Sequence, residues 1–84
     1  MSVDEIKIKV KDSLKRLLEI GEQEVTDQED LNQLGMDSMS SVNLVVELEE
    51  MFDIVFDDEE LLFENFSTVQ KITDIVERKL VLPQ

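Results

Sequence analysis

The chain has 84 residues, with 21 Asp and Glu against 8 Lys and Arg, which gives a formal net charge of -13. It contains no cysteine and no histidine, so disulfide bonds, zinc–thiolate sites and histidine-based catalytic triads are excluded. Nucleic acid and anionic membranes would repel this charge and are not expected as partners. With 42% hydrophobic residues, the chain can still build one core, and we expect a single domain over residues 1–84.

Membrane insertion and secretion are not expected from the sequence. No apolar run approaches the roughly 20 residues that span a bilayer, and the first ten residues lack the apolar segment of a secretion signal. A small domain without disulfide bonds suits a reducing compartment. We therefore expect a cytoplasmic protein that acts as a monomer.

Apolar residues at helical spacing predict a first helix over residues 3–20. Ser2 and Glu5 have the spacing of a capping box, and Gly21 offers a C-terminal stop. A long stretch without periodicity follows, over residues 22–37, and loops of this length are often functional. We expect the loop to be fixed to the core by its apolar residues and to turn at Gly35; these apolar residues are Val25, Leu31 and Leu34.

A second helix is predicted over residues 38–53, and it carries two apolar stripes. The core stripe comprises Leu44, Val45, Leu48 and Phe52. The second stripe comprises Met39, Val42 and Val46 and is bordered by Glu49 and Glu50. A helix on the outside of a small domain needs one stripe for its core, so the second indicates a surface that meets another molecule. The alternative is that the preceding loop covers it.

The remaining segments predict two more helices. Four consecutive acids begin at Asp57 and favour a short helix over residues 57–63, because the helix dipole stabilises acids in a first turn. Ser67 and Gln70 repeat the spacing of a capping box before a last helix, which ends before Pro83. The predicted fold class is all-α, with three main helices and one short helix.

The acids could suggest hydrolysis or metal binding, and neither is expected. All basic residues lie near the two ends, so the stretch from 17 to 70 holds 16 Asp and Glu and no Lys or Arg. A glycosidase needs a cleft that holds sugar, and a small hydrolase is the least favoured class. Calcium loops need oxygen ligands in their early positions and a glycine after them, whereas after Asp53 this chain has Ile54, Val55 and Phe56 in the early positions and no glycine. No metal site is expected.

Ser38, at the start of the second helix, has two interpretations. A serine in this place is most often an N-cap. The long loop, the acidic surroundings and the second stripe favour a site that another protein modifies. No histidine or lysine base lies nearby in the sequence, so Ser38 is not expected to be a nucleophile in its own right. An acidic docking module, in which Ser38 is only a cap, stays open.

The residues around Ser38 resemble the signature L-G-x-D-S-L/M of the acyl carrier protein family, which includes peptidyl and aryl carrier domains. The matching run is Leu34-Gly35-Met36-Asp37-Ser38-Met39. The resemblance continues through residues 42–53 and through residues 66–69, where the family enters its last helix. It covers the whole chain in order and spacing.

The resemblance implies a four-helix bundle that is a carrier and not an enzyme. Ser38, next to Asp37, would receive 4'-phosphopantetheine from coenzyme A through a separate transferase that uses Mg²⁺. The thiol of this arm would hold acyl or aminoacyl groups as thioesters. The second helix would be read by basic patches on loading and chain-modifying enzymes, through Asp37, Met39, Val42, Val46, Glu47, Glu49 and Glu50.

Three positions depart from the pattern of housekeeping fatty-acid carriers. That pattern places acids two and five residues after the modified serine and a proline shortly before the third helix, where this chain has Ser40, Asn43 and Asp57. The resemblance therefore favours a discrete carrier for polyketide or nonribosomal peptide synthesis. A housekeeping fatty-acid carrier is the alternative.

Overall fold

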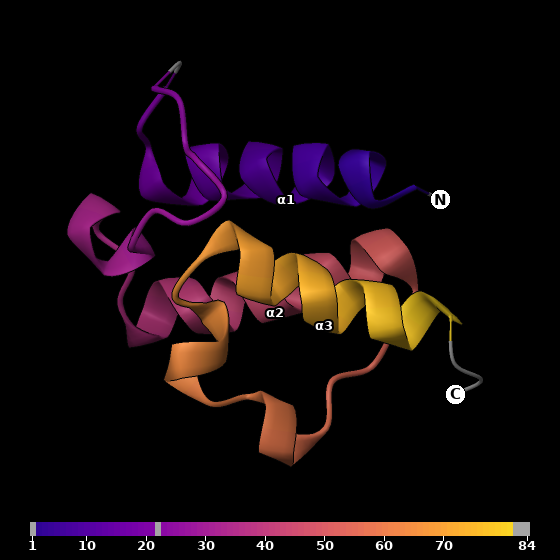
Figure 1. The fold of residues 1–84 in the computed structure, drawn as a ribbon. Coiled ribbons are helices and arrows are strands. Elements are labelled where there is room, and N and C mark those ends of the chain that lie inside the picture. Colours follow the sequence, from indigo (N-terminus) through magenta and orange to yellow (C-terminus); the bar gives the residue numbers. More distant parts are fainter. Residues whose placement is uncertain (1, 22, 82–84) are drawn as a thin grey trace.

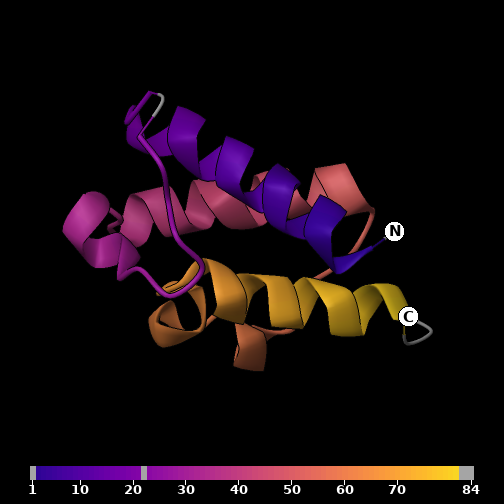
Figure 2. The same cartoon turned by 45° about the horizontal axis from the view of Figure 1, so that its top comes forward.

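The computed structural model describes residues 2–21 and 23–81, and over these residues the chain is helical without strands, which confirms the predicted all-α class (Figure 1). In chain order the elements are α1 (Val3–Leu18), η1 (Leu31–Leu34), α2 (Ser38–Phe52), η2 (Asp58–Glu60), η3 (Phe63–Phe66) and α3 (Val69–Val81). The η elements are 3-10 helices. In Figures 1 and 2 the start of α1 and the end of α3 lie at the same end of the molecule.

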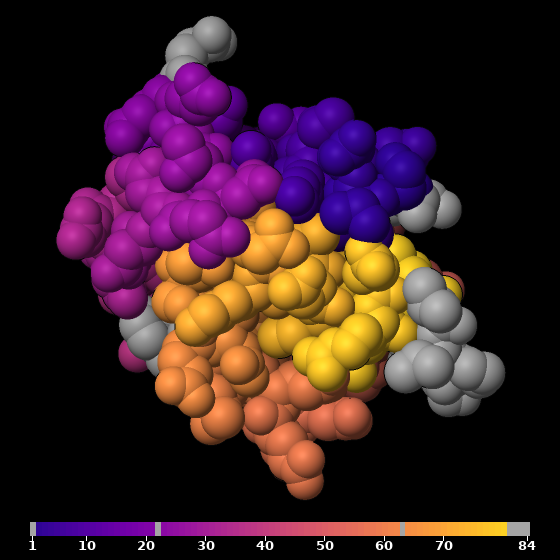
Figure 3. Space-filling model, viewed as in Figure 1, coloured from indigo at the N-terminus to yellow at the C-terminus, as the bar shows by residue number. Residues whose placement is uncertain are grey.

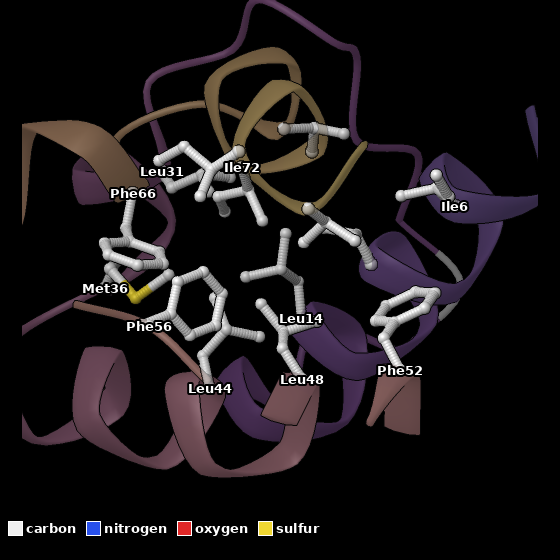
Figure 4. Packing of buried hydrophobic residues seen from close by; sticks show 14 of the residues in the cluster. Ile6, Leu14, Leu31, Met36, Leu44, Leu48, Phe52, Phe56, Phe66 and Ile72 are labelled. Atoms are coloured by element: carbon white, nitrogen blue, oxygen red, sulfur yellow. The ribbon is translucent and has the colours of Figure 1, made fainter. Parts of the chain in front are cut away.

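α1 packs against both α2 and α3, and η3 contacts α2 and α3. The face seen in Figure 3 is formed by α1, by the loop that follows it and by α3, with the segment that contains η2 at its lower edge. The core between the helices is apolar, and Leu14, Leu48 and Ile72 come from three different helices (Figure 4). Phe56 and Phe66 meet edge to face, with ring centroids 5.7 Å apart, an arrangement that aromatic pairs prefer.

The core stripe predicted for α2 is largely confirmed. Leu44, Leu48 and Phe52 are buried, and Val45 is half-buried against the core. Burial of such side chains is the main stabilising term for a domain of this size. The face of α2 that carries these residues therefore points into the core, and its opposite face points to solvent.

Of the predicted capping box at the start of α1, the bond to the Ser2 hydroxyl is present, but no bond from the Glu5 carboxylate back to Ser2 is seen among the described residues, and the predicted end of the helix differs. The Ser2 hydroxyl accepts a hydrogen bond from the Glu5 N–H at 3.2 Å, as a cap should. The predicted stop at Gly21 is wrong, because the helix ends at Leu18 and Glu19 adopts the left-handed conformation with φ of 54°. Ile20, just beyond this end, packs against the core.

The long loop is tied to both α1 and α3. Asp27 forms ion pairs with Lys7 at 2.8 Å and Lys11 at 3.1 Å on α1, and its carbonyl accepts the Gln70 N–H of α3 at 3.0 Å. The Leu31 N–H donates to the carbonyl of residue 67 at 2.8 Å. The loop therefore lies over the α1–α3 side of the molecule.

The apolar residues of the loop behave as predicted, since Val25 and Leu31 are buried and Leu34 is partly buried. Gly35 has φ of 106°, a conformation that a residue with a Cβ resists. The 3-10 helix η1 within the loop was not predicted. Asp30 caps η1 by accepting the Asn32 N–H at 2.9 Å.

The short helix predicted over residues 57–63 is instead a pair of 3-10 helices, η2 and η3. Asp57 and Glu60 form a capping box at the start of η2. Leu62 has extended backbone, with φ of -74° and ψ of 136°, and it separates η2 from η3. Lys79 of α3 reaches Glu60 at 2.6 Å and lies over the Phe56 ring, 5.8 Å from its centroid. Lys79 thus connects residues 56–60 to α3.

The cap of α3 differs from the predicted one. The Thr68 hydroxyl accepts the Lys71 N–H at 3.2 Å, whereas the Ser67 hydroxyl donates to the Glu64 carbonyl at 2.8 Å. The Gln70 side chain donates to Asp74 instead of reaching back. The expected end of the helix before residue 83 lies outside the described residues. Among the described helices, none has the length and apolar character needed to cross a bilayer.

Candidate functional site

Ser38 is the first residue of α2 and is exposed, but it is not the cap of the helix. Asp37 is the N-cap, and its carboxylate accepts the Ser40 N–H at 2.8 Å. The interpretation of Ser38 as an N-cap is therefore wrong, because the neighbouring carboxylate already satisfies the donor that a cap would serve. The Ser38 hydroxyl forms no hydrogen bond with any described residue and faces solvent.

The charge beside Ser38 is fixed by the same cap. The backbone N–H of Ser40 bonds to the carboxylate of Asp37 and holds its pKa below the ordinary value, because a hydrogen bond to the charged form favours ionisation. The N-terminal end of the helix dipole favours this negative charge as well. A protein that approaches Ser38 therefore meets an anion next to the hydroxyl.

A cleft of about 270 Å³ opens next to Ser38, between α2 and the segment that carries η2 and η3. Its lining comprises Ser38, Ser41, Val42, Val45, Val46, Leu61 and Phe66. Five of these side chains are apolar, and the two serines contribute the hydroxyls. The exposed serine thus lies at an apolar depression that could hold part of a flexible group attached to it.

The second apolar stripe of α2 is exposed, as predicted. The exposed fractions are 75% for Met39, 62% for Val42 and 48% for Val46. The alternative, in which the loop over residues 22–37 covers this stripe, is wrong because that loop is tied to α1 and α3. The stripe and the cleft share Val42 and Val46, so they form one continuous apolar area beside Ser38.

The four acids expected to take part in recognition, Asp37 and the three glutamates, have different surroundings. Glu47 is paired with Arg16 of α1 at 2.7 Å. The Glu49 carboxylate accepts the Phe56 N–H at 3.0 Å and so holds the start of the following segment. Glu50 is exposed and has no hydrogen bond or ion pair with any described residue. Glu50 and Asp37 are therefore the acids of this set with the greatest freedom to meet a partner.

Sequence reasoning missed three residues that line the cleft: Ser41, Leu61 and Phe66. Ser41 lies three positions after Ser38, a spacing that places two side chains on the same side of a helix, so its position could have been inferred. Leu61 and Phe66 reach the cleft only because the η2–η3 segment folds back beside α2. No local sequence signal marks that contact.

The site offers a hydroxyl and apolar walls, and the described residues show no cluster of metal ligands. Within residues 2–21 and 23–81, no group of three Asp, Glu, His or Cys side chains could hold a metal. The hydroxyl of Ser38 is exposed, and the walls of the cleft beside it are mostly apolar.

The comparisons with known proteins agree with this arrangement. A family described as the phosphopantetheine attachment site matches residues 9–76. The acyl carrier protein of Thermotoga maritima is 39% identical over 80 residues, which cover 94% of this chain and 96% of that protein. The acyl carrier protein of Coprothermobacter proteolyticus is 35% identical over 81 residues, covering 95% of this chain and 96% of that protein. The acyl carrier protein of Chloroherpeton thalassium is 37% identical over 81 residues, with coverages of 94% and 99%.

The family match spans most of the chain, and these relatives align over nearly their whole length. Members of the family are not enzymes; they bear phosphopantetheine and work with a transferase and with biosynthetic enzymes. The all-helical fold is consistent with this similarity. On the strength of the family match and of these relatives, the chain belongs to the acyl carrier protein family.

Proposed function

We propose that Ser38 is the residue that bears 4'-phosphopantetheine, and that the chain carries acyl or aminoacyl groups on this arm between partner enzymes. The observation that supports this most directly is that Asp37, and not Ser38, caps α2. Asp37 caps the helix, which leaves the Ser38 hydroxyl exposed and free of hydrogen bonds with described residues. A cleft with apolar walls lies beside it.

Loading needs a separate enzyme, because the chain has no histidine and Ser38 lies in a stretch without lysine. In this step the Ser38 oxygen bonds to the phosphorus that bears the pantetheine of coenzyme A. The diphosphate P–O bond breaks, 3',5'-ADP leaves with the electron pair, and the hydroxyl proton passes to a base of the transferase. The attached group supplies the terminal thiol that the cysteine-free chain lacks. Tethering raises the effective concentration of a cargo at each partner.

The exposed stripe and its acids suit short encounters with basic partners. Asp37 and Glu50 would give electrostatic attraction, while Met39 and Val42 would supply apolar contact. Complementary charge increases association rates more than it tightens a complex. This is the behaviour that a shuttle between several enzymes requires.

The test of Ser38 is a loading reaction with coenzyme A, Mg²⁺ and a broad-specificity phosphopantetheinyl transferase. We expect the intact protein to gain the mass of one phosphopantetheine, and peptide mapping to find it on Ser38. Ser38→Ala should gain nothing, whereas Ser40→Ala should load, since Ser40 lies two residues away on the same helix. Mass gain by Ser38→Ala, or none by the native chain, contradicts the proposal.

The same variants separate the carrier from an acidic docking module without a prosthetic group. If the chain were only a docking module, Ser38→Ala would keep its function in the host. Loss of an N-cap serine costs roughly 1 kcal/mol, but Ser38→Ala should not carry this cost, because Asp37 and not Ser38 is the cap. Loss of function with unchanged stability would therefore point to loss of the arm.

For the pathway, we propose polyketide or nonribosomal peptide synthesis, with a housekeeping fatty-acid carrier as the alternative. The support is the resemblance pattern at Ser40, Asn43 and Asp57. Asn43 is exposed on α2, where a partner would meet a neutral amide instead of an acid. Asp57 caps η2. Mass spectrometry of the protein purified from its native host identifies the attached cargo, and saturated chains of increasing length would contradict the proposed pathway.

A further inference from the structure

The hydroxyl of Ser41 is a polar group without a partner in the wall of the cleft. Ser41 lies one turn after Ser38 on α2, and its residue is 8% exposed. Its Oγ is buried and forms no hydrogen bond with any described residue, while its N–H donates to the Asp37 carbonyl at 2.9 Å. Buried polar groups are nearly always paired, because an unpaired one loses its hydrogen bonds to water without compensation.

The surroundings of Ser41 make this hydroxyl distinctive. The other residues that line the cleft are Ser38 and five apolar residues, namely Val42, Val45, Val46, Leu61 and Phe66. If Ser38 carries the arm, its oxygen becomes part of a phosphodiester and no longer donates a hydrogen bond. Ser41 then supplies the one side-chain donor among the described residues of the lining.

We propose that the cleft selects a short acyl cargo that carries an oxygen, as a carbonyl or hydroxyl group, close to the thioester, and that Ser41 hydrogen-bonds to this oxygen. The inference rests on the proposed attachment of the arm to Ser38. A purely alkyl chain in the cleft would leave the Ser41 hydroxyl unpaired, whereas an oxygenated chain satisfies it. A site built to hydrogen-bond a ligand discriminates against an analogue that lacks the polar group.

The size of the cleft limits the cargo. At about 270 Å³, it lies just below the roughly 300–1,000 Å³ of sites that enclose drug-sized ligands. Its walls are apolar apart from the serines, so the rest of the cargo has to be apolar as well. The chemistry that fits is a short carbon chain with one oxygen function near the thioester end.

Thr73 provides a matched control in the same molecule. Its Oγ1 is also buried without a partner among the described residues, and Thr73 lies on α3 and does not line the cleft. Ser41→Ala and Thr73→Val each remove one unpaired buried hydroxyl with little change of shape. Both variants should therefore fold with at least the stability of the native chain, and only Ser41→Ala should alter the cleft.

The experiment loads three cargoes onto the native chain, Ser41→Ala and Thr73→Val by transfer from their coenzyme A thioesters. The cargoes are hexanoyl, 3-oxohexanoyl and 3-hydroxyhexanoyl. Protection of each thioester is the rate of its cleavage by hydroxylamine relative to the same thioester on free pantetheine. This ratio removes the intrinsic reactivity of each cargo.

On the native chain and on Thr73→Val, we expect the two oxygenated cargoes to be protected about two- to tenfold more than hexanoyl, the range that one neutral hydrogen bond provides. On Ser41→Ala this difference should disappear. Equal protection of the three cargoes on the native chain overturns the proposal. An equal loss for all three on Ser41→Ala overturns it too, because the hydroxyl would then bind the arm or the thioester that they share.

The loading step separates this proposal from the one on which it rests. If the native chain gains no mass from any of the three thioesters, the attachment of the arm to Ser38 is contradicted, and the inference about Ser41 falls with it. If loading is complete but protection does not depend on the oxygen, only the inference about Ser41 is contradicted.

Discussion

α1 and α2 bury the same kind of apolar face in one core, but their outer faces are used differently. On α1, Lys7 and Lys11 are engaged within the molecule by Asp27 of the loop. On α2, three apolar side chains at helical spacing stay exposed, namely Met39, Val42 and Val46. Lys7 and Lys11 on α1 thus stabilise the fold, whereas the stripe of α2 is left uncovered by the described residues.

The difference concerns the grouping of exposed apolar residues and not their presence. α1 also exposes an apolar residue, since Ile8 is 58% exposed, but it stands among charged side chains. Single exposed apolar residues are ordinary in soluble proteins, whereas a contiguous group next to a cleft indicates binding. The outer face of α2 is therefore where partners should act, and that of α1 is where they should not.

The largest expected effect tests the shared part of the comparison, the buried faces. Leu14 of α1 and Leu48 of α2 are both fully buried. Leu14→Ala and Leu48→Ala should each lower the free energy of unfolding by about 2–5 kcal/mol, because each leaves a cavity in the core. Urea unfolding measures this loss. A loss for either variant well under about 2 kcal/mol would mean that the two helices do not contribute equally to one core.

The next effect tests the outer faces with a matched pair, Ile8→Ser on α1 and Val42→Ser on α2. The two side chains are exposed to 58% and 62%, so both variants should stay within about 0.5 kcal/mol of the native stability. Val42→Ser should lower kcat/KM of the phosphopantetheinyl transferase by about fivefold, the loss expected for an interface residue worth about 1 kcal/mol.

Ile8→Ser is the control for that measurement and should load at the native rate. If both variants load at the native rate, the exposed stripe of α2 does not contact the transferase. If Ile8→Ser loads as slowly as Val42→Ser, the contrast between the two helices fails, because a partner would then use the outer face of α1 as well.

The helices that were predictable are those whose apolar spacing directly forms the core. Leu14 and Leu48 belong to patterns that have one physical solution, a stripe turned inward. Helix ends were less predictable. Glu19 ends α1 and Thr68 caps α3, and these roles depend on the path of the chain outside the helices. The segment after Asp57 was expected to be one helix, but the extended backbone at Leu62 divides it.

Of the candidate site, only the residues that lie close together in the sequence were predicted. The exposed stripe follows from spacing within one helix, and Ser38 was singled out by its neighbours along the chain and by the signature of residues 34–39. Asp37 and Ser38 are adjacent and both suit an N-cap, and in the structure the cap is Asp37, whose backbone is extended. The cleft joins α2 to Leu61 and Phe66, and this contact depends on the packing of distant segments, which no local pattern reports.

The smallest expected effect concerns the charges of α1. The hydrogen bond from Lys7, followed by that from Lys11, holds the pKa of Asp27 below its ordinary value of 3.8. A lowered folded-state pKa means that the ionised carboxylate stabilises the fold above that ordinary value, and that this contribution is lost as the pH falls through the folded-state pKa. Because the pair is partly exposed, we expect Asp27→Asn to cost less than about 1 kcal/mol at neutral pH.

Urea unfolding of the native chain and of Asp27→Asn at pH values from neutral to acid measures this contribution. The difference between the two should shrink as the pH falls below 3.8, the ordinary value for Asp27. Glu24→Gln is the matched control, since Glu24 is exposed in the same loop, the substitution removes the same charge, and no ion pair joins Glu24 to a described residue. A pH-independent cost for Asp27→Asn would mean that the lysines of α1 do not hold the loop by charge, because the ionised carboxylate would then contribute no more than the protonated carboxyl group.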